Sequence, residues 1–162
     1  MRVLVIGAGG VGGAFAAIIA RRKFASKLII ADVNFDKARA VALSVSNSGL
    51  EVCAESVDAS SEASVYDVAQ RHNADAIINL CAPLFNPPIF AAALKAGCTY
   101  IDTACNLSQP HLEKPYELMG QTLGVEQFAQ SPIWEAKGQL ALTGMGVEPG
   151  LSDVFARYAA DH

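Results

Sequence analysis

The sequence predicts an α/β fold, a doubly wound parallel sheet of about six strands with helices on both faces. Short apolar runs alternate along the chain with longer stretches of helical periodicity, which is the pattern of βαβ units with right-handed crossovers. Hydrophobic residues make up 52% of the chain and charged residues 17%, and this balance suits strands that are buried on both faces. With 162 residues the chain is long enough for one domain with its own core.

Six short apolar runs are the expected strands. In chain order they are Val3–Ile6, Leu28–Ala31, Glu51–Val57, Ala76–Leu80, Thr99–Asp102 and Gln139–Thr143. A sheet built from such units is expected to have the strand order 3-2-1-4-5-6.

The first expected helix runs from Gly10 to Arg22. Its apolar positions at helical spacing are Val11, Phe15, Ile18 and Ile19. It ends in three cations that suit a helix C-terminus, namely Arg21, Arg22 and Lys23.

Two further helices separate the next strands. Asn34 is expected to cap the second helix, and Ser60 or Ser61 the third. The expected inner stripe of the second helix is Ala38, Val41 and Val45, and that of the third is Val65, Val68 and Ala69.

In the second half of the chain, Pro87 and Pro88 lie in the first turn of a helix that reaches Lys95 and ends at Gly97. A polar loop is expected from Thr103 to Pro115. Further helices are expected at Glu117–Ala129, Ile133–Lys137 and Leu151–Ala160. The last helix carries four apolar positions that need a partner surface, Leu151, Val154, Phe155 and Tyr158.

A glycine-rich turn directly follows the first strand and opens the first helix. The segment Gly7-Ala8-Gly9-Gly10-Val11-Gly12 fits G-x-G-x-x-G, and Asp32 ends the next strand about 20 residues after Gly12. Strand, helix and acid are therefore in the register of the dinucleotide-binding fingerprint of a Rossmann fold. The alternative, in which the glycines form only a tight turn and Asp32 caps a helix, does not need this register.

Each residue of the fingerprint has a physical role. Gly7 permits the tight turn out of the strand, Gly9 lets a pyrophosphate approach the backbone, and Gly12 lets the helix pack closely on the sheet. The N–H groups near Gly10 and Val11 are expected to point at the phosphates, with the helix dipole assisting.

Asp32 is expected to accept hydrogen bonds from the hydroxyl groups of the adenosine ribose. A carboxylate at this position repels a 2′-phosphate, and no arginine follows in Val33 or Asn34. The sequence therefore favours NAD over NADP as the cofactor, with Asp32 and Val33 as binding residues.

Three more strand ends are expected at the same edge of the sheet, where ligands bind in open α/β folds. Asp58 follows the third strand, either beside the adenine or as a loop-capping carboxylate. After the fourth strand, the small residues Cys81, Ala82 and Pro83 would let the nicotinamide half lie flat. For Asp102, after the fifth strand, the loop-capping role is preferred.

Beyond the fingerprint, several pieces occur in a characteristic order. They are Asn79–Pro83 after the fourth strand, Tyr100–Asp102 after a helix ending in Ala-Gly, and Gly144–Asp153, which contains a G-x-x-P-G-like loop leading into a helix. In this order the chain resembles the N-terminal part of the saccharopine dehydrogenase-like family, which includes saccharopine reductase, lysine 6-dehydrogenase and carboxynorspermidine dehydrogenase.

The resemblance implies an NAD(P)-dependent oxidoreductase that transfers hydride between a nicotinamide and an imine carbon of an amino-acid substrate. In that family a second domain builds most of the substrate pocket. We therefore expect residues 1–150 to form the NAD(P)-binding domain and residues 151–162 to begin the connection to a C-terminal substrate and catalytic domain. The chain alone is expected to bind the dinucleotide without catalysing a reaction, and no catalytic residue is assigned to it.

Several other residues were weighed as site residues. His111 and Glu113 lie in the polar loop, and each is expected to be solvated rather than a general acid or base. A packing role is expected for Cys81 and Trp134, the latter at the interface with the second domain. A structural role is expected for His72 at a helix end and for Glu148 in its loop.

Two other functions use a similar fingerprint. A regulatory NAD-sensing module would bind the dinucleotide without chemistry, and it is the main alternative. A segment that binds FAD would more often have glutamate in place of Asp32.

Composition and the lack of certain motifs argue against several other classes of protein and site. The net charge of −4 and the pI near 5.3 argue against a nucleic-acid partner. Neither a zinc site nor a disulfide framework is signalled by the four cysteines, which are expected to be reduced thiols. With no signal peptide and no apolar run of the ~18–20 residues that span a bilayer, a cytoplasmic protein is expected. The sequence leaves undecided whether the apolar positions of the last helix form a homodimer.

Overall fold

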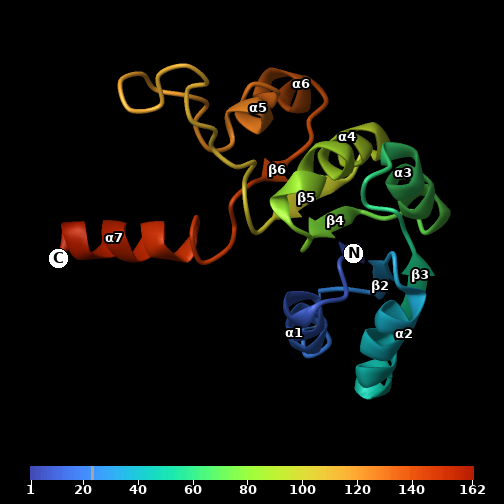
Figure 1. The fold of residues 1–162 in the computed structure, drawn as a ribbon. Coiled ribbons are helices and arrows are strands. Elements are labelled where there is room, and N and C mark those ends of the chain that lie inside the picture. The colour runs from blue at the N-terminus through green and yellow to red at the C-terminus, as the bar shows by residue number, and fades with distance from the viewer. Residues whose placement is uncertain (23) are drawn as a thin grey trace.

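The computed structural model describes residues 1–22 and 24–162. It contains a sheet of six strands in the order β3-β2-β1-β4-β5-β6, and every neighbouring pair is parallel (Figure 1). The strands are β1 Arg2–Ile6, β2 Lys27–Asp32, β3 Glu51–Ser56, β4 Ala76–Asn79, β5 Thr99–Asp102 and β6 Ala141–Leu142. The predicted fold class and strand order are confirmed.

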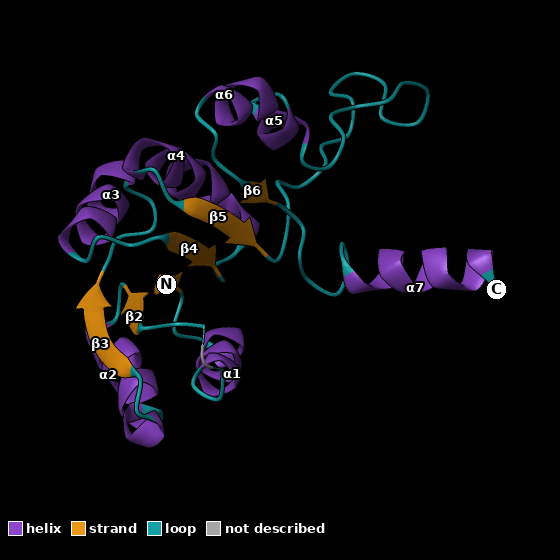
Figure 2. Cartoon of the chain, turned by 180° about the vertical axis from the view of Figure 1, so that it is seen from behind, coloured by secondary structure: helices purple, strands orange, loops and turns teal. Residues whose placement is uncertain are grey.

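Helices cover both faces of this sheet. The helices are α1 Gly10–Ile19, α2 Phe35–Ser44, α3 Glu62–Arg71, α4 Asn86–Ala96, α5 Val125–Phe128, α6 Ser131–Ala136 and α7 Leu151–Asp161, and the 3₁₀ turns are η1 Ser46–Ser48 and η2 Pro83–Phe85. In Figures 1 and 2, α1 and α2 lie on one side of the strands, and α3 and α4 lie on the other.

Two apolar clusters, one on each face, form the core. Alternate residues of one strand belong to different clusters: Leu4 and Ile6 pack with α3 and α4, whereas Val3 and Val5 pack with α1 and α2. Successive side chains of a strand point to opposite faces, so continuous apolar strands are what a sheet covered twice requires.

The helix caps mostly follow the sequence. The side chain of Asn34 accepts a hydrogen bond from the N–H of Lys37 at 3.2 Å, as predicted for an N-cap. Of the two serines left open, Ser61 is the cap of α3 and accepts from the N–H of Ser64 at 3.2 Å. Gly97 ends α4 with a φ of +77°, a conformation that glycine adopts without strain.

The expected apolar stripe of α1 is wrong in part. The buried residues of this helix are Gly12, Ala16 and Ile19, whereas Val11 and Ile18 are more than half exposed. Glycine and alanine face the sheet because they let the helix axis approach it closely. The helix ends at Ile19, so Arg21 and Arg22 lie beyond it, and Lys23 lies outside the described residues.

The helix expected at Glu117–Ala129 is also wrong over most of its length, because only Val125–Phe128 is helical. Residues 107–123 instead form an irregular excursion that an antiparallel bridge between Gln109 and Gln121 closes. At Gly120 a Cβ atom would lie closer than 3.0 Å to the carbonyl oxygen of Gln109. Only glycine lets these two backbone segments lie so close together, and this contact forms where the helix was expected.

The last helix, α7, extends away from the body of the molecule in both views (Figures 1 and 2). None of its residues is buried, and its apolar positions Leu151, Val154, Phe155 and Tyr158 are all exposed. Among the described residues these side chains therefore have no packing partner sufficient to bury them.

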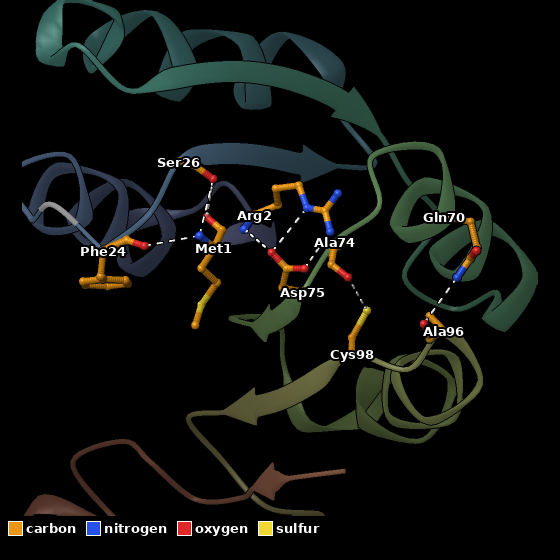
Figure 3. A network of polar contacts seen from close by, with 9 residues as sticks. All are labelled: Met1, Arg2, Phe24, Ser26, Gln70, Ala74, Asp75, Ala96 and Cys98. Atoms are coloured by element: carbon orange, nitrogen blue, oxygen red, sulfur yellow. Dashed lines mark hydrogen bonds and ion pairs between the residues drawn. The ribbon is translucent and has the colours of Figure 1, made fainter. Parts of the chain in front are cut away.

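At the amino-terminal edge of the sheet, polar contacts join the N-terminus to β2 and to the start of β4 (Figure 3). The guanidinium of Arg2 donates to Asp75 Oδ1 at 2.7 Å, and the backbone N–H of Arg2 donates to Asp75 Oδ2 at 2.6 Å. The Met1 ammonium donates to the carbonyl of Phe24 at 3.3 Å. These contacts lie at the sheet edge opposite to the carboxyl ends of the strands.

This edge makes the stability of the protein sensitive to acid. Hydrogen bonds from Arg2 lower the pKa of Asp75 from 3.8 to about 2. A carboxyl with a depressed pKa in the folded state stabilises it above pH 3.8, and the contribution is lost as the pH falls toward 2. Because both side chains are about two fifths exposed, the contribution is at most about 1 kcal/mol.

We therefore expect Asp75→Asn to lower the free energy of unfolding near neutral pH, and the difference from wild type to shrink below pH 3.8. Thermal unfolding at a series of pH values measures it. The exposed Asp67 on α3 offers a matched carboxyl-to-amide control, Asp67→Asn. A difference between Asp75→Asn and wild type that stays constant down to the lowest pH contradicts the prediction.

Candidate functional site

A groove with a volume of about 330 Å³ lies at the carboxyl ends of β1, β2, β3 and β4. The predicted site residues that line it are Gly7, Gly9, Asp32, Val33, Asp58, Cys81 and Ala82. Its other lining residues were not predicted: Ile6, Val57, Ala59, Leu80 and Phe85. The groove is thus built from four strand ends that lie far apart in the sequence.

The glycine turn lies in the groove between the ends of β2 and β4. Gly7 has a φ of +105°, and a Cβ atom there would lie 3.0 Å from the carbonyl oxygen of Leu80 at the end of β4. A Cβ atom on Gly12 would lie closer than 3.0 Å to the carbonyl oxygen of Gly7. Both positions therefore require glycine so that the turn, the helix and β4 can meet.

Gly9 differs from these two residues. It lines the groove, and a Cβ atom there would have no heavy atom within 4 Å. The space beside its backbone is therefore open toward a ligand, whereas the space beside Gly7 and Gly12 is filled by protein. A pyrophosphate fits the position that a side chain would otherwise occupy.

The start of α1 suits an anion. The N-cap Gly9 offers no side-chain acceptor, and the first turn contains no acidic residue. The N–H groups of Gly10, Val11 and Gly12 therefore have no acceptor within the helix, and they carry the positive end of its dipole. Gly10 and Val11 are exposed and lie beside the groove rather than in its lining.

Two backbone N–H groups hold the Asp32 carboxylate. Its Oδ2 accepts from Ala8 in the glycine turn at 2.8 Å, and its Oδ1 accepts from Asn34 at 2.9 Å. Asn34, not Asp32, is the N-cap of α2, so the helix-capping alternative for Asp32 is wrong. The contact with Ala8 ties the acid of β2 to the turn after β1.

Asp58 has the loop-capping role that the sequence left open, and it also lies in the groove lining. Its Oδ1 accepts from the hydroxyl of Ser60 at 2.6 Å and from the N–H of Ser60 at 2.9 Å, so it closes a loop. These hydrogen bonds hold the pKa of Asp58 below its usual range. Asp58 also lines the groove, and the end of β2 lies between it and the glycine turn.

The loop after β4 forms the end of the groove that is farthest from Asp58 along the sheet. The backbone N–H of Cys81 donates to Asn79 Oδ1 at 3.0 Å. Cys81 packs against the apolar cluster on the α3 and α4 face, as its predicted packing role requires. Burial, assisted by the charge of Asp32, raises the pKa of its thiol to about 11, which agrees with this role.

Of the three site residues predicted in this loop, Pro83 is the one that does not line the groove. It begins the η2 turn and lies with Leu84 and Pro87 in a neighbouring pocket. Phe85, which was not predicted, lines the groove instead. An aromatic residue within one turn of a strand end is the signal that points to it.

Asp102 lies outside the groove lining and is buried. Its carboxylate accepts from the hydroxyl of Tyr100, the side-chain amide of Gln127 and the N–H of Gly144. It therefore has the structural role that the sequence favoured.

The remaining candidates have structural environments as well. Trp134 is buried against Phe90, with ring centroids 4.8 Å apart, so its expected place at a domain interface is wrong. His111 accepts from backbone N–H groups inside the excursion, and Glu148 is exposed. His72 caps the end of α3 and pairs with Glu55 at 2.6 Å.

Two kinds of feature are absent from residues 1–22 and 24–162, the part of the chain that the structure describes. In this part of the chain, no cluster of histidine, cysteine or acidic side chains could hold a metal ion. No helix there has both the length and the apolar character needed to cross a membrane. All four cysteines are free.

Comparison with known proteins gives three kinds of match. A family model described as "Saccharopine dehydrogenase NADP binding domain" matches residues 3–142. Among curated proteins, the chain is 29% identical over 161 residues to carboxyaminopropylagmatine dehydrogenase from Synechocystis sp., covering 99% of this chain and 38% of that protein. It is 29% identical over 171 residues to carboxynorspermidine synthase from Vibrio alginolyticus, covering 100% of this chain and 40% of that protein.

The chain thus spans about two fifths of the length of these curated relatives. Among solved structures, apo saccharopine dehydrogenase (L-Glu forming) from Saccharomyces cerevisiae superposes with a TM-score of 0.74 at 18% identity. That superposition covers 99% of this chain and 30% of the other. The likeness confirms the fold.

Proposed function

Since the chain belongs to the saccharopine dehydrogenase NADP binding domain family, we propose that its groove binds NAD for an oxidoreductase that acts on a carbon–nitrogen bond of an amino-acid substrate. The observation that carries the proposal is the contact between Asp32 and the glycine turn. This contact supports the proposal because it holds a carboxylate that could accept from ribose hydroxyls close to Gly9, whose open backbone could take a pyrophosphate.

Different groove residues would contact different parts of the dinucleotide. Gly9 and the first N–H groups of α1 would hold the pyrophosphate, while Asp32 would accept from the adenosine ribose. Val33 and Asp58 line the adenosine end, and Cys81 and Ala82 line the nicotinamide end. The bound nicotinamide supplies the hydride donor or acceptor of the reaction.

The substrate assignment is supported by the relatives. Their names, a dehydrogenase of carboxyaminopropylagmatine and a synthase of carboxynorspermidine, describe amines that carry a carboxyl group. A dehydrogenase of such a compound acts on a carbon–nitrogen bond. The alternative, an NAD-sensing module without catalysis, is not favoured by these relatives.

The substrate pocket and the catalytic groups would then come from a domain that follows α7. In support, the described residues leave the apolar side of α7 exposed, and the groove contains no group suited to proton transfer except carboxylates that are already hydrogen-bonded. We propose residues 1–150 as the dinucleotide-binding domain and residues 151–162 as the start of the connection. The isolated chain should bind the dinucleotide and show no turnover.

The preference for NAD rests on Asp32. The family name specifies NADP, whose 2′-phosphate would meet the Asp32 carboxylate. Two N–H groups hold this carboxylate in place, so it cannot turn away without losing both hydrogen bonds. The next residues, Val33, Asn34 and Phe35, provide no cation for a phosphate.

Calorimetric titration with NAD and NADP tests both parts of this proposal. Wild type should bind NAD more tightly than NADP, and Asp32→Ala should reduce that ratio about tenfold, because one charge repulsion of roughly 1.4 kcal/mol is removed. Asp36→Ala, at an exposed acid in the first turn of α2, is the matched control and should preserve the ratio.

Tighter binding of NADP than NAD by wild type would overturn the cofactor preference and leave the domain assignment standing. Failure of wild type to bind either dinucleotide would overturn the binding function of the groove. Thermal unfolding of each variant shows whether the lost hydrogen bonds of Ala8 and Asn34 disturb the fold.

A further inference from the structure

A chain of buried polar groups connects the groove to the turn that precedes α7. Asn79, Tyr100 and Asp102, at the ends of β4 and β5, are each at most 1% exposed. Asn79 Oδ1 accepts from the N–H of Cys81 at 3.0 Å, and Asn79 Nδ2 donates to the Tyr100 hydroxyl at 3.1 Å. That hydroxyl donates to Asp102 Oδ2 at 2.9 Å, and Asp102 Oδ1 accepts from the N–H of Gly144 at 2.7 Å.

Asp102 holds the turn at two points. Its backbone carbonyl accepts from the N–H of Met145 at 2.8 Å, beside the side-chain contact with Gly144. A Cβ atom on Gly146 would lie closer than 3.0 Å to the carbonyl oxygen of Thr103, so the turn also packs directly on the backbone after β5. The start of α7 is therefore positioned from the end of β5.

Close packing alone does not require this arrangement. A buried carboxylate is costly, and the donors that contact Asp102 among the described residues are all neutral. Apolar side chains of similar volume would fill the same space without this cost. The buried polar groups instead set the relative positions of the loops, because each hydrogen bond fixes one loop relative to the next.

We propose that Asp102 and Tyr100 are positioning residues that shape the nicotinamide end of the groove. They act through Asn79, which holds the N–H of Cys81 in the loop that lines this end. The same two residues hold the Gly144 turn, so the nicotinamide position and the start of α7 are fixed by one network. This inference rests on the proposed function, because it assumes that the dinucleotide lies in the groove.

Tyr100→Phe is the test variant. It removes only the hydroxyl and keeps the ring, which packs edge-on against Phe90 at 4.9 Å between centroids. The comparison uses two probes, NAD and ADP, titrated calorimetrically. ADP lacks the nicotinamide half of the dinucleotide, so it reports on the binding of the adenosine and the phosphates without the nicotinamide.

Tyr100→Phe should weaken NAD binding about tenfold and leave ADP binding within about twofold of wild type. Tyr66→Phe, on α3 and outside the network and the groove lining, is the matched control and should change neither affinity. A merely structural role for Tyr100 would lower both affinities together.

An equal loss of NAD and ADP affinity in Tyr100→Phe, or no loss of NAD affinity in a folded variant, overturns the inference while wild-type binding upholds the proposed function. If wild type binds neither probe, the proposed function fails, and the inference falls with it. A circular dichroism spectrum like that of wild type establishes that the variant is folded.

Discussion

Gly12→Ala is expected to lower the free energy of unfolding by roughly 3 kcal/mol or more. The added methyl group would lie closer than 3.0 Å to the backbone carbonyl oxygen of Gly7. A carbonyl in a turn of φ +105° has little freedom to move, since the N–H of Gly7 is also bonded to Ala31 at 2.8 Å. Either the turn or the first turn of α1 must shift, so binding in the groove should be lost as well.

The matched control is the next glycine of the same helix, Gly13. A Cβ atom there would meet only Val41 Cγ2, at 4.0 Å, so it makes an ordinary contact. Gly13→Ala should stabilise the protein by about 0.5–1 kcal/mol, because alanine loses less conformational freedom in a helix than glycine. Chemical denaturation measures both variants, and similar stabilities for the two would contradict the close contact at Gly12.

Gly9→Asp should abolish dinucleotide binding without destabilising the fold. Aspartate is a favourable N-cap, and its charge suits the start of α1, so the free energy of unfolding should stay the same or rise. A carboxylate about 4 Å from a pyrophosphate charge is repelled by roughly 4 kcal/mol at an effective dielectric constant of 20, so we expect at least a hundredfold loss of NAD affinity.

Gly9→Asn separates charge from size in this experiment. It also caps the helix and has nearly the same volume as aspartate, but it carries no charge. We expect it to bind NAD more weakly than wild type and more tightly than Gly9→Asp, as measured by calorimetry. Unchanged NAD affinity in Gly9→Asp would show that the pyrophosphate does not lie beside Gly9.

The strands and their order were predictable from the sequence because the sheet is covered on both faces. Leu4 and Val5 face opposite helix layers, and both are apolar because both layers are buried. Neighbouring residues of a strand are therefore apolar alike, which produces the continuous apolar runs that mark each strand. The glycine turn was predictable for a related reason. Its spacing is set by local backbone geometry between β1 and α1 and needs no knowledge of distant contacts.

The errors lie where distant segments meet. In α1, Val11 and Ile18 were expected to be buried, but the helix turns Gly12 and Ala16 toward the sheet because close approach excludes large side chains. Residues 117–124 were predicted to be helical, yet they run irregularly, and a bridge between Gln109 and Gln121 joins them to an earlier part of the chain. Helical periodicity does not encode either contact.

By itself, the sequence determined the fold class, the strand order, the family resemblance and the segments that form the groove, since repeated local patterns carry all of these. Only the tertiary structure decided which residues line the groove: it turned Pro83 away and brought in Phe85. It also joined Asn79, Tyr100, Asp102 and Gly144 into one buried network. The physical reason is that a buried polar group must find partners in three dimensions, and these partners leave no periodic trace along the chain.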